Sequence, residues 1–313
     1  MSKQSRRQFL AHSAVLGASA LAVEPLWALV PVKRPAMTIA RWAGSGQLSG
    51  SRVDQVATRL TEKAIEGLGG LGRFVRRGDV VWIKPNMAWD RTPELAANTN
   101  PAVVATLVRL CFEAGAKTVK VGDNPCDIAQ KSYGSSGIAA AVQPLGAKVV
   151  YLDRRRFRMT NIGGQRVKSV PLYPEVLDCD VLINVPVAKH HRLAGLTMCM
   201  KNYMGVMENR RVFHQAIPEC LTDLTRFMKP RTALSVLDCV RVLNDHGPKG
   251  GNPEDVLLKT TVAAGVDPVA LDAFGAELMG RKPEQIGSIV KGDQAGLGTM
   301  DYRSLGPKEI AVS

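Results

Sequence analysis

The sequence predicts an α/β fold: a mostly parallel, doubly wound sheet with helices on both faces. Two observations lead to this prediction. Short runs rich in Val, Ile and Leu alternate along the chain with stretches whose apolar residues recur every three or four positions. The apolar runs are nearly continuous, which is typical of parallel strands buried on both faces. Alternating strands and helices favour a layered α/β domain.

Six short segments are predicted to be strands, because they are apolar, rich in β-branched residues and bounded by polar residues or turns. They cover residues 79–86, 116–124, 147–153, 180–187, 233–240 and 260–267. In open parallel sheets, ligands bind beyond the carboxyl ends of the strands. If all six strands are parallel, their polar ends converge on one edge; these ends include Lys84, Asn86, Asp123, Asn124, Asp153, Lys189, His190, His191, Asp238 and Asp267.

Amphipathic stretches between these strands predict the helices. Residues 51–66 carry their apolar side chains on one stripe, and Gly67 follows them. Residues 101–114 are preceded by Asn100, a favourable N-cap, and followed by Gly115, which suits a C-terminal turn. Further helices are predicted at residues 136–144, 218–228, 268–279 and 283–290.

Residues 187–217 form the longest stretch without clear periodicity. We expect an irregular insertion or lid there, because long irregular segments inside compact domains are usually functional. The rest of the chain contains no internal repeat and no convincing boundary. Residues 38–313 are therefore predicted to form a single α/β domain.

The N-terminal residues have the order of a bacterial export signal. Arg6 and Arg7 precede an apolar run, residues 9–23, that contains small residues at cleavage spacing. This run is shorter than the ~20 apolar residues that span a bilayer, which favours a removable signal over a stable membrane anchor. We predict a twin-arginine signal peptide at residues 1–22, a linker at residues 23–37, recognition by the twin-arginine export machinery and a periplasmic or otherwise exported protein. The alternative is an arginine-rich tail on a cytosolic protein.

The formal net charge is +13, and three of the positive charges lie in the predicted signal peptide. The remaining positive charge favours anionic partners such as small carboxylates or phosphates. Nucleic acid is disfavoured, because the densest basic run, residues 153–158, is short and only 5% of the residues are aromatic. We expect Arg154 to Arg156 to be a solvated strand end, and the alternative is that they capture an anion.

The six cysteines include no CxxC pair, so neither a ferredoxin-type cluster nor a zinc ribbon has a local signature. Several cysteines lie in apolar segments, where a small buried thiol is the usual arrangement. We therefore expect mostly free, buried cysteines.

Three lysines are candidates for holding an anion: Lys84, Lys189 and Lys201. Each lies at or beyond a predicted strand end, and Asn86 and Asn202 add hydrogen-bond donors beside them. Point charges with nearby donors are what a carboxylate or phosphate requires. The alternative for each lysine is a side chain that extends from the strand end into water.

The histidines outside the signal peptide gather in one window: His190, His191, His214 and His246. Imidazole suits acid–base chemistry near neutral pH and also ligates transition metals. Asp223, Asp238 and Asp245 lie in the same window and could complete a mixed nitrogen–oxygen metal site. No two of these histidines have helical i, i+4 spacing, and each could instead be a surface residue or a hydrogen-bonded core residue.

A series of short motifs extends over nearly the whole chain from Lys84 to Asp301. It includes Lys84 to Asn86, Thr99 to Pro101, Gly122, Asp123, Asn184 to Pro186, Lys189, His191, Lys201, Asn202, Gly205, His214, Asp223, Asp238, Gly247, Pro248 and Asp267 to Asp272. In this order the motifs resemble the bacterial and archaeal family known as domain of unknown function 362. The resemblance implies membership and no particular reaction; His191 and His214 match the family pattern, whereas His190 and His246 do not clearly match. Some relatives append ferredoxin-type cysteine motifs, which this chain lacks, so an iron–sulfur cluster is not carried over.

We predict an enzyme of unknown reaction that acts on a small anionic substrate, a carboxylate or a phosphate. The residues assigned to substrate binding are Lys84, Asn86, Lys189 and Asn202, and those assigned to catalysis are His191, His214 and Lys201. The candidate ligands of an unidentified divalent metal are Asp123, Asp238, His191 and His214. The alternatives are a periplasmic redox protein with a metal or iron–sulfur centre, and a non-catalytic anion-binding protein.

Overall fold

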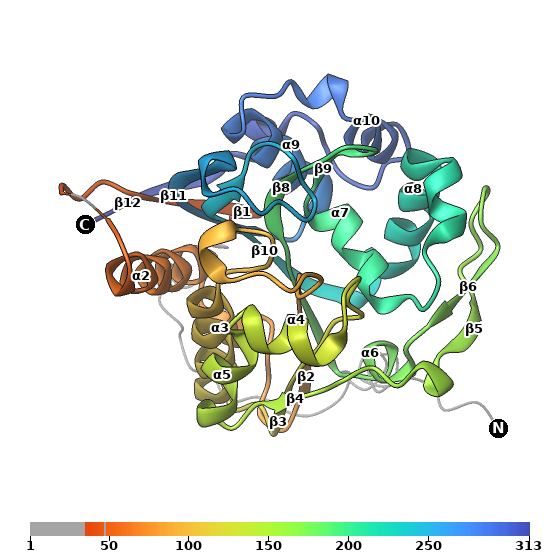
Figure 1. Cartoon of the computed structure of the whole chain (residues 1–313), viewed down its shortest axis with the longest axis horizontal. Helices are drawn as coiled ribbons and strands as arrows, with labels where there is room; N and C mark the ends of the chain where they lie inside the picture. The colour runs from red at the N-terminus through yellow and green to blue at the C-terminus, as the bar shows by residue number, and fades with distance from the viewer. Residues whose placement is uncertain (1–34, 47) are drawn as a thin grey trace, which may run out of the picture. The chain divides into compact units, whose positions relative to one another are not determined.

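The computed structural model describes residues 35–46 and 48–313. Within these residues one large sheet lies at the centre, and a two-stranded sheet is separate from it (Figure 1). The strands are β1 (Met37–Trp42), β2 (Val80–Pro85), β3 (Thr118–Val121), β4 (Lys148–Val149), β5 (Arg158–Asn161), β6 (Ser169–Leu172), β7 (Val181–Val185), β8 (Val187–His191), β9 (Gly195–Thr197), β10 (Thr232–Leu243), β11 (Val256–Gly265) and β12 (Lys308–Val312). The predicted signal peptide, residues 1–22, and all but the last residues of the predicted linker lie outside the described residues.

The main path of the large sheet runs in the order β12-β1-β11-β10-β7-β2-β3-β4. Along this path β10, β7, β2, β3 and β4 are parallel to one another. β11 is antiparallel to both of its neighbours, β10 and β1, and β12 is parallel to β1. β8 pairs in parallel with β10, β9 pairs antiparallel with β8, and β5 pairs with β6. The predicted α/β fold with a mostly parallel sheet is confirmed.

Helices cover both faces of this sheet, as the apolar strand sequences predict (Figure 1). The helices are α2 (Ser51–Gly67), α3 (Pro101–Glu113), α4 (Ala129–Ser135), α5 (Ile138–Val142), α6 (Pro174–Leu177), α7 (Cys199–Asn202), α8 (Ile217–Met228), α9 (Pro268–Leu278) and α10 (Gly287–Gln294). Side chains alternate along β2: Val81 and Ile83 pack in the core with α2 and α3, whereas Trp82 packs in the core with α8. The sheet therefore separates two apolar layers.

The expectation that every predicted strand points to the same edge is wrong for residues 260–267. This segment belongs to β11, which runs against its neighbours, so Asp267 lies at the opposite edge of the sheet. There Asp267 Oδ1 accepts hydrogen bonds from the backbone N–H groups of Val269 and Ala270 and caps α9. An apolar run carries no signal of its direction, which explains the error.

The expectation of an irregular insertion at residues 187–217 is wrong for its first part. β8 and β9 form a hairpin of the large sheet, in which Lys189 pairs with Thr197 and His191 with Gly195. α7 and the 3₁₀ turns η6 (Tyr203–Val206) and η7 (Arg211–Gln215) complete the segment. Each of these elements is too short to display a helical or strand period in the sequence.

The described residues belong to one compact unit, Arg34–Ser313. Its first strand, β1, begins at the last residue of the segment that we expected to be a linker. None of the helices in the described residues is long and apolar enough to cross a membrane.

The order of the strands creates a crevice at the carboxyl edge of the parallel part of the sheet. From β2 the chain proceeds to β3 and β4 on one side, and it later returns to β7 and β10 on the other side of β2. The direction of travel across the sheet therefore reverses between β2 and β7. Ligands of open α/β sheets bind outside the strand ends at such a reversal.

Candidate functional site

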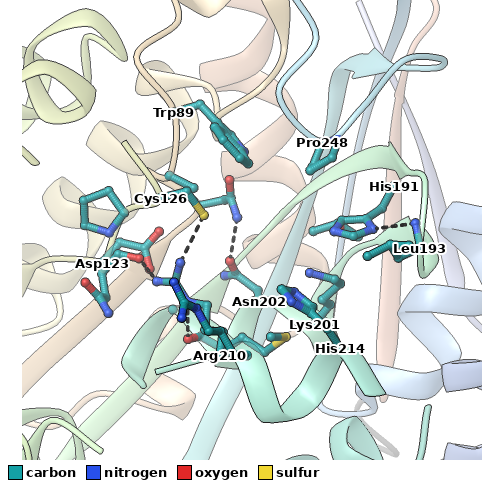
Figure 2. Close-up of a pocket in the computed structure, with 18 of the residues that line it drawn as sticks. Trp89, Asp123, Cys126, His191, Leu193, Lys201, Asn202, Arg210, His214 and Pro248 are labelled. Carbon is teal, nitrogen blue, oxygen red and sulfur yellow. Dashed lines mark hydrogen bonds between the residues drawn. The ribbon is translucent and has the colours of Figure 1, made fainter. Parts of the chain in front are cut away.

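A pocket of about 660 Å³ opens at this edge of the sheet (Figure 2). Its lining comes from the segments that follow β2 and β3, from the β8–β9 hairpin, from α7 and from the turns after it. The predicted site residues that line it are Asn86, Asp123, Lys189, His191, Lys201, Asn202 and His214. Lys84 lies behind this lining and contacts two lining residues, Asp123 and Asn202. Asp238 does not line the pocket and instead accepts a hydrogen bond from Asn100 N.

The side-chain nitrogen of Lys84 is held by acceptor atoms of the protein itself. Its Nζ lies 2.8 Å from Asp123 Oδ1 and donates hydrogen bonds to Pro85 O at 2.8 Å and to Asn202 Oδ1 at 3.0 Å. Two of its N–H groups are used by these two oxygens, and the Asp123 carboxylate balances its charge. Burial lowers the pKa of Lys84, and the neighbouring Asp123 carboxylate opposes that effect. We therefore reassign Lys84 from substrate binding to support of the pocket floor.

The two asparagines connect the lysines of the floor. Asn202 Oδ1 accepts hydrogen bonds from Lys84 Nζ and, at 3.2 Å, from Asn86 Nδ2. Asn202 Nδ2 donates to Lys84 O at 3.2 Å and to Asn184 Oδ1 at 2.8 Å. Asn86 Oδ1 accepts from Lys189 Nζ at 2.9 Å. Both asparagines line the pocket, but most of their hydrogen-bonding capacity holds neighbouring side chains in place.

Gly205 allows the η6 turn to approach this floor. The backbone N–H of Asn124 donates to Gly205 O at 2.8 Å, and that of Met87 donates to Asp123 Oδ2 at 2.8 Å. A Cβ atom at position 205 would overlap both Asp123 Oδ1 and Lys84 Nζ. The close approach of the turn to the buried ion pair therefore requires glycine.

Lys189 reaches the pocket from β8 and is only 1% exposed. Its Nζ donates to Asn86 Oδ1 and to the backbone oxygen of Ala97. The third N–H of the ammonium form has no acceptor among the described residues and is available to a ligand. Burial lowers the pKa of Lys189 to about 7, and the positive charge of Lys201 acts in the same direction.

Lys201 is positioned by a carboxylate from another helix. Asp272 on α9 accepts hydrogen bonds from the backbone N–H groups of Cys199, at 2.6 Å, and Met200, at 3.1 Å, which fixes the start of α7. The half-buried Lys201 then lines the pocket, and its Nζ has no hydrogen bond or ion pair with any described residue. Burial lowers the pKa of Lys201 to about 8, and the charge of Arg210 adds to this effect.

His191 faces the pocket as a neutral hydrogen-bond donor. Its Nδ1 accepts hydrogen bonds from the backbone N–H groups of Leu193 and Ala194, both at 3.2 Å. Figure 2 shows the bond from Leu193. Burial lowers the pKa of His191 to about 3, helped by the charges of Lys201 and Lys189. The proton of the neutral ring therefore resides on Nε2. In this tautomer His191 can donate to a ligand but offers no free lone pair to a metal or a proton.

His214 is the histidine that remains free for acid–base chemistry. It lies on η7, is exposed at the pocket, and makes no hydrogen bond with any described residue. Burial lowers its pKa, and the charges of Lys201 and Arg210 contribute. The other two histidines have separate roles: His190 Nδ1 accepts from Gly247 N, and His246 pairs with Asp255 on the surface.

The candidate metal ligands do not come together. Asp238 lies within β10, which continues past the predicted strand end, and its oxygens accept hydrogen bonds from Asn100 N at 2.7 Å and Val240 N at 2.9 Å. Asp123 is held by Lys84 and Met87 N. Within residues 35–46 and 48–313 no group of three or more His, Cys, Asp and Glu side chains is arranged to hold a metal ion. Asp223, also considered from the sequence, instead accepts hydrogen bonds from the backbone of residues 165–167.

Sequence reasoning missed several lining residues. Arg210 donates to Cys126 Sγ at 3.0 Å, to Met204 O at 3.1 Å and to the backbone oxygen of Asn124. All six cysteines are free, as expected, and four of them are buried, but Cys126 is exposed in the pocket. The position of Cys126, shortly after Asp123 at the end of β3, was the available signal. Arg210 could not be found from the sequence, because its loop has no motif or periodicity.

Figure 2 shows Asp123, Cys126 and Arg210 on one side of the pocket and His191, Lys201 and His214 on the other. The fold and this arrangement define a class: an α/β protein with a lysine- and arginine-lined pocket at the reversal point of its sheet. The chain belongs to the family described as "Domain of unknown function (DUF362)", whose model matches residues 81–277. It is 31% identical over 263 residues to "Thylakoid-associated protein sll1697" of Synechocystis sp., and the match covers 79% of each chain.

Two solved structures are similar over most of this chain. One is the lactate racemase apoprotein from Thermoanaerobacterium thermosaccharolyticum, with 14% identity and a TM-score of 0.46 over 79% of this chain. The other is a protein from Thermotoga maritima, with 11% identity and a TM-score of 0.43 over 78% of this chain. The matches cover 58% and 60% of those two chains, so this chain spans well under two thirds of their length.

Proposed function

We propose that the pocket binds a small organic anion, a carboxylate or a phosphate, and that the protein is an enzyme acting on this anion. The observation that carries the proposal is the state of Lys201. Its side-chain nitrogen lines the pocket without a partner among the described residues, whereas Lys84 is surrounded by acceptors. A half-buried cation without a counter-ion favours an anionic ligand, because the ligand supplies the missing charge.

The charge balance of the lining supports the same conclusion. Among the described residues the lining contains Lys189 and Lys201 together with four arginines: Arg154, Arg192, Arg210 and Arg211. Its carboxylates are Asp123 and Glu208, and Asp123 is already paired with Lys84. The neutral donor His191 Nε2–H adds a directional hydrogen bond. Apolar side chains such as Trp89, Leu193 and Pro248 provide contact surface for the organic part of a ligand.

Two lysines of the lining exchange protons near neutral pH, because burial lowers the pKa of Lys189 to about 7 and that of Lys201 to about 8. The pKa of His214 is lowered from its ordinary value by burial and by the charge of Lys201. In this account Lys201, Lys189 and His191 bind the anion, and Lys201 and His214 also act as acid–base groups. His191, which sequence reasoning assigned to catalysis, becomes a binding residue.

The experiment is a thermal-shift screen with phosphate, malonate, succinate and pyruvate on the wild type and on Lys201→Met. At least one anion should raise the Tm of the wild type. Lys201→Met should keep the unliganded Tm and lose the response to the anion. The matched control is Lys131→Met, which removes an exposed lysine charge from α4, outside the pocket. An unchanged response in Lys201→Met would rule out this site.

We also propose that the protein is exported by the twin-arginine route. The order of Arg6, Arg7, an apolar run and small residues in the sequence supports this proposal. The location of the Synechocystis relative, given only by its name, belongs to that protein.

A further inference from the structure

The three lysines at this edge of the sheet differ in how many protein acceptors surround the side-chain nitrogen. Lys84 Nζ has three acceptors, one of them a carboxylate, and Lys189 Nζ has two. Lys201 Nζ has none among the described residues. Lys84 and Lys189 are each only 1% exposed and hold protein acceptors, whereas Lys201 is half-buried and lines the open pocket. Lys201 is thus the lysine whose nitrogen a carbonyl group can approach.

The neighbours of Lys201 supply what an amine nucleophile needs. His214 also lines the pocket, and the charge of Lys201 lowers its pKa, so the two side chains are within electrostatic reach. His214 has no competing hydrogen bond among the described residues and can carry a proton to and from a reacting group. The charge of Lys201 influences both Lys189 and His191, which places the three side chains within electrostatic reach. Lys189 and His191 each have an N–H available to hold a carboxylate beside the amine.

We propose that the anion bound in this pocket is an oxo-carboxylate, such as a 2-oxo acid, and that Lys201 forms an imine with its carbonyl group. The inference rests on the anion-binding function proposed above. The carboxylate contacts Lys189 and His191, and the carbonyl carbon faces Lys201 Nζ. The apolar wall formed by residues such as Trp89 and Met204 contacts the rest of the ligand.

The step is balanced without any further reactant. The neutral amine of Lys201 attacks the carbonyl carbon and forms a C–N bond, and His214 moves one proton from this nitrogen to the carbonyl oxygen to give a neutral carbinolamine. His214 then takes the second proton of the nitrogen and donates it to the hydroxyl group. The C–O bond breaks, water leaves, and the C=N bond of the imine remains. With a pKa of about 8, roughly a tenth of Lys201 is already the neutral amine at pH 7.

The test traps the imine by reduction. The full chain is incubated at pH 7 with pyruvate or 2-oxoglutarate and sodium cyanoborohydride, and its intact mass and peptide map are then measured. We expect a mass increase equal to the oxo acid less one oxygen atom, on Lys201 and at much higher occupancy than on the exposed Lys131. Lys201→Arg keeps the positive charge but cannot form the imine, so it should lose the adduct while pyruvate still raises its Tm.

Three other outcomes would overturn the inference, and they separate it from the function on which it rests. If an anion stabilises the protein but no selective adduct forms on Lys201, the imine is wrong and the anion site stands. If the adduct forms on Lys189, the assignment of the nucleophile is wrong. If no anion raises the Tm and no adduct forms, both proposals fail.

Discussion

Three identical side chains have three different roles at the pocket because their partners differ. Lys84 is held by Asp123 and two further oxygens, Lys189 is held by neutral acceptors, and Lys201 is unpartnered among the described residues. The sequence predicts that all three approach one edge, because each lies at a strand end or beyond it. The sequence does not indicate which lysine has its charge balanced by a carboxylate, because that depends on the contact between Lys84 on β2 and Asp123 after β3.

The buried pair of Lys84 and Asp123 leads to a stability prediction. Lys84→Met should lower the free energy of unfolding by about 3–5 kcal/mol, because Asp123 would remain buried without its counter-ion. Urea denaturation monitored by circular dichroism measures this quantity. The surface control Lys131→Met should change it by less than about 0.5 kcal/mol. A loss in Lys84→Met as small as in this control would contradict the structural role of the pair.

The lowered pKa of Lys201 leads to a pH prediction. A lysine is positively charged below its pKa and neutral above it, so the contribution of Lys201 to anion affinity should be retained below pH 8 and fall as the pH rises through about 8. Lys189, whose pKa is about 7, adds an earlier fall. The fall should reach up to roughly tenfold per pH unit if one proton is required. Titrations of phosphate or malonate between pH 6 and pH 10 measure it. In Lys201→Arg the fall through pH 8 should disappear, and only the fall near pH 7 caused by Lys189 should remain; a fall through pH 8 in this variant would assign the effect to another group.

At the scale of elements, α7 shows how the fold places a functional side chain. It is a short helix, and Asp272 from α9 accepts hydrogen bonds from the backbone N–H groups of its first two residues, Cys199 and Met200. The helix is therefore oriented by a contact between segments far apart in the sequence. This dependence explains why residues 187–217 had no readable period although they carry much of the site.

The capping contact gives a prediction for a residue outside the pocket lining. Asp272→Ala removes the acceptors of Cys199 N and Met200 N, so Lys201 should lose its fixed position and anion affinity should fall at least tenfold. Asp272→Asn retains one acceptor oxygen and should recover part of this affinity. Calorimetric titration well below the Tm of each variant separates this effect from unfolding. Wild-type affinity in Asp272→Ala would show that α7 does not depend on the cap.

The strands show where periodicity is informative and where it fails. The prediction of β2, β3, β7 and β10 follows from their near-continuous apolar runs, and the boundaries of α3 follow from Asn100 and Gly115. The direction of β11 and the extension of β10 beyond Asp238 depend on pairing with distant strands. For these two reasons Asp267 and Asp238, which the sequence predicted at the same edge as the other candidates, lie outside the site. Asn86, Asp123 and Lys189 converge because the strands that carry or precede them are parallel. Lys201 and His214 are instead placed by α7 and η7.

For the whole molecule, the sheet topology explains the position of the pocket. The chain reverses its direction of travel across the sheet between β2 and β7. Side chains from the segments after β2 and β3 meet those from the β8–β9 hairpin and α7 beyond the strand ends. The sequence alone identifies the edge but not the reversal point. Residues from loops without periodicity, such as Arg210, complete the lining and become visible only in the folded chain.

The proposed export by the twin-arginine route concerns the whole chain, and it leads to a separate prediction. When the full-length chain is expressed in a bacterium with a functional twin-arginine system, the mature protein should be found in the periplasmic fraction without residues 1–22, as intact mass will show. Replacing Arg6 and Arg7 by lysines should retain the protein in the cytoplasm. Periplasmic delivery of this lysine variant at the wild-type level would contradict the twin-arginine route.

The central claim is that Lys201 is the cation that recognises a small anion in this pocket. The most direct measurement is isothermal titration calorimetry of the best anion from the thermal-shift screen into the wild type, Lys201→Met and Lys131→Met at pH 7. The account predicts one site per chain in the wild type and in Lys131→Met. It predicts a loss of about 2 kcal/mol or more in Lys201→Met, roughly 30-fold in Kd. Equal affinity in all three proteins would contradict the claim.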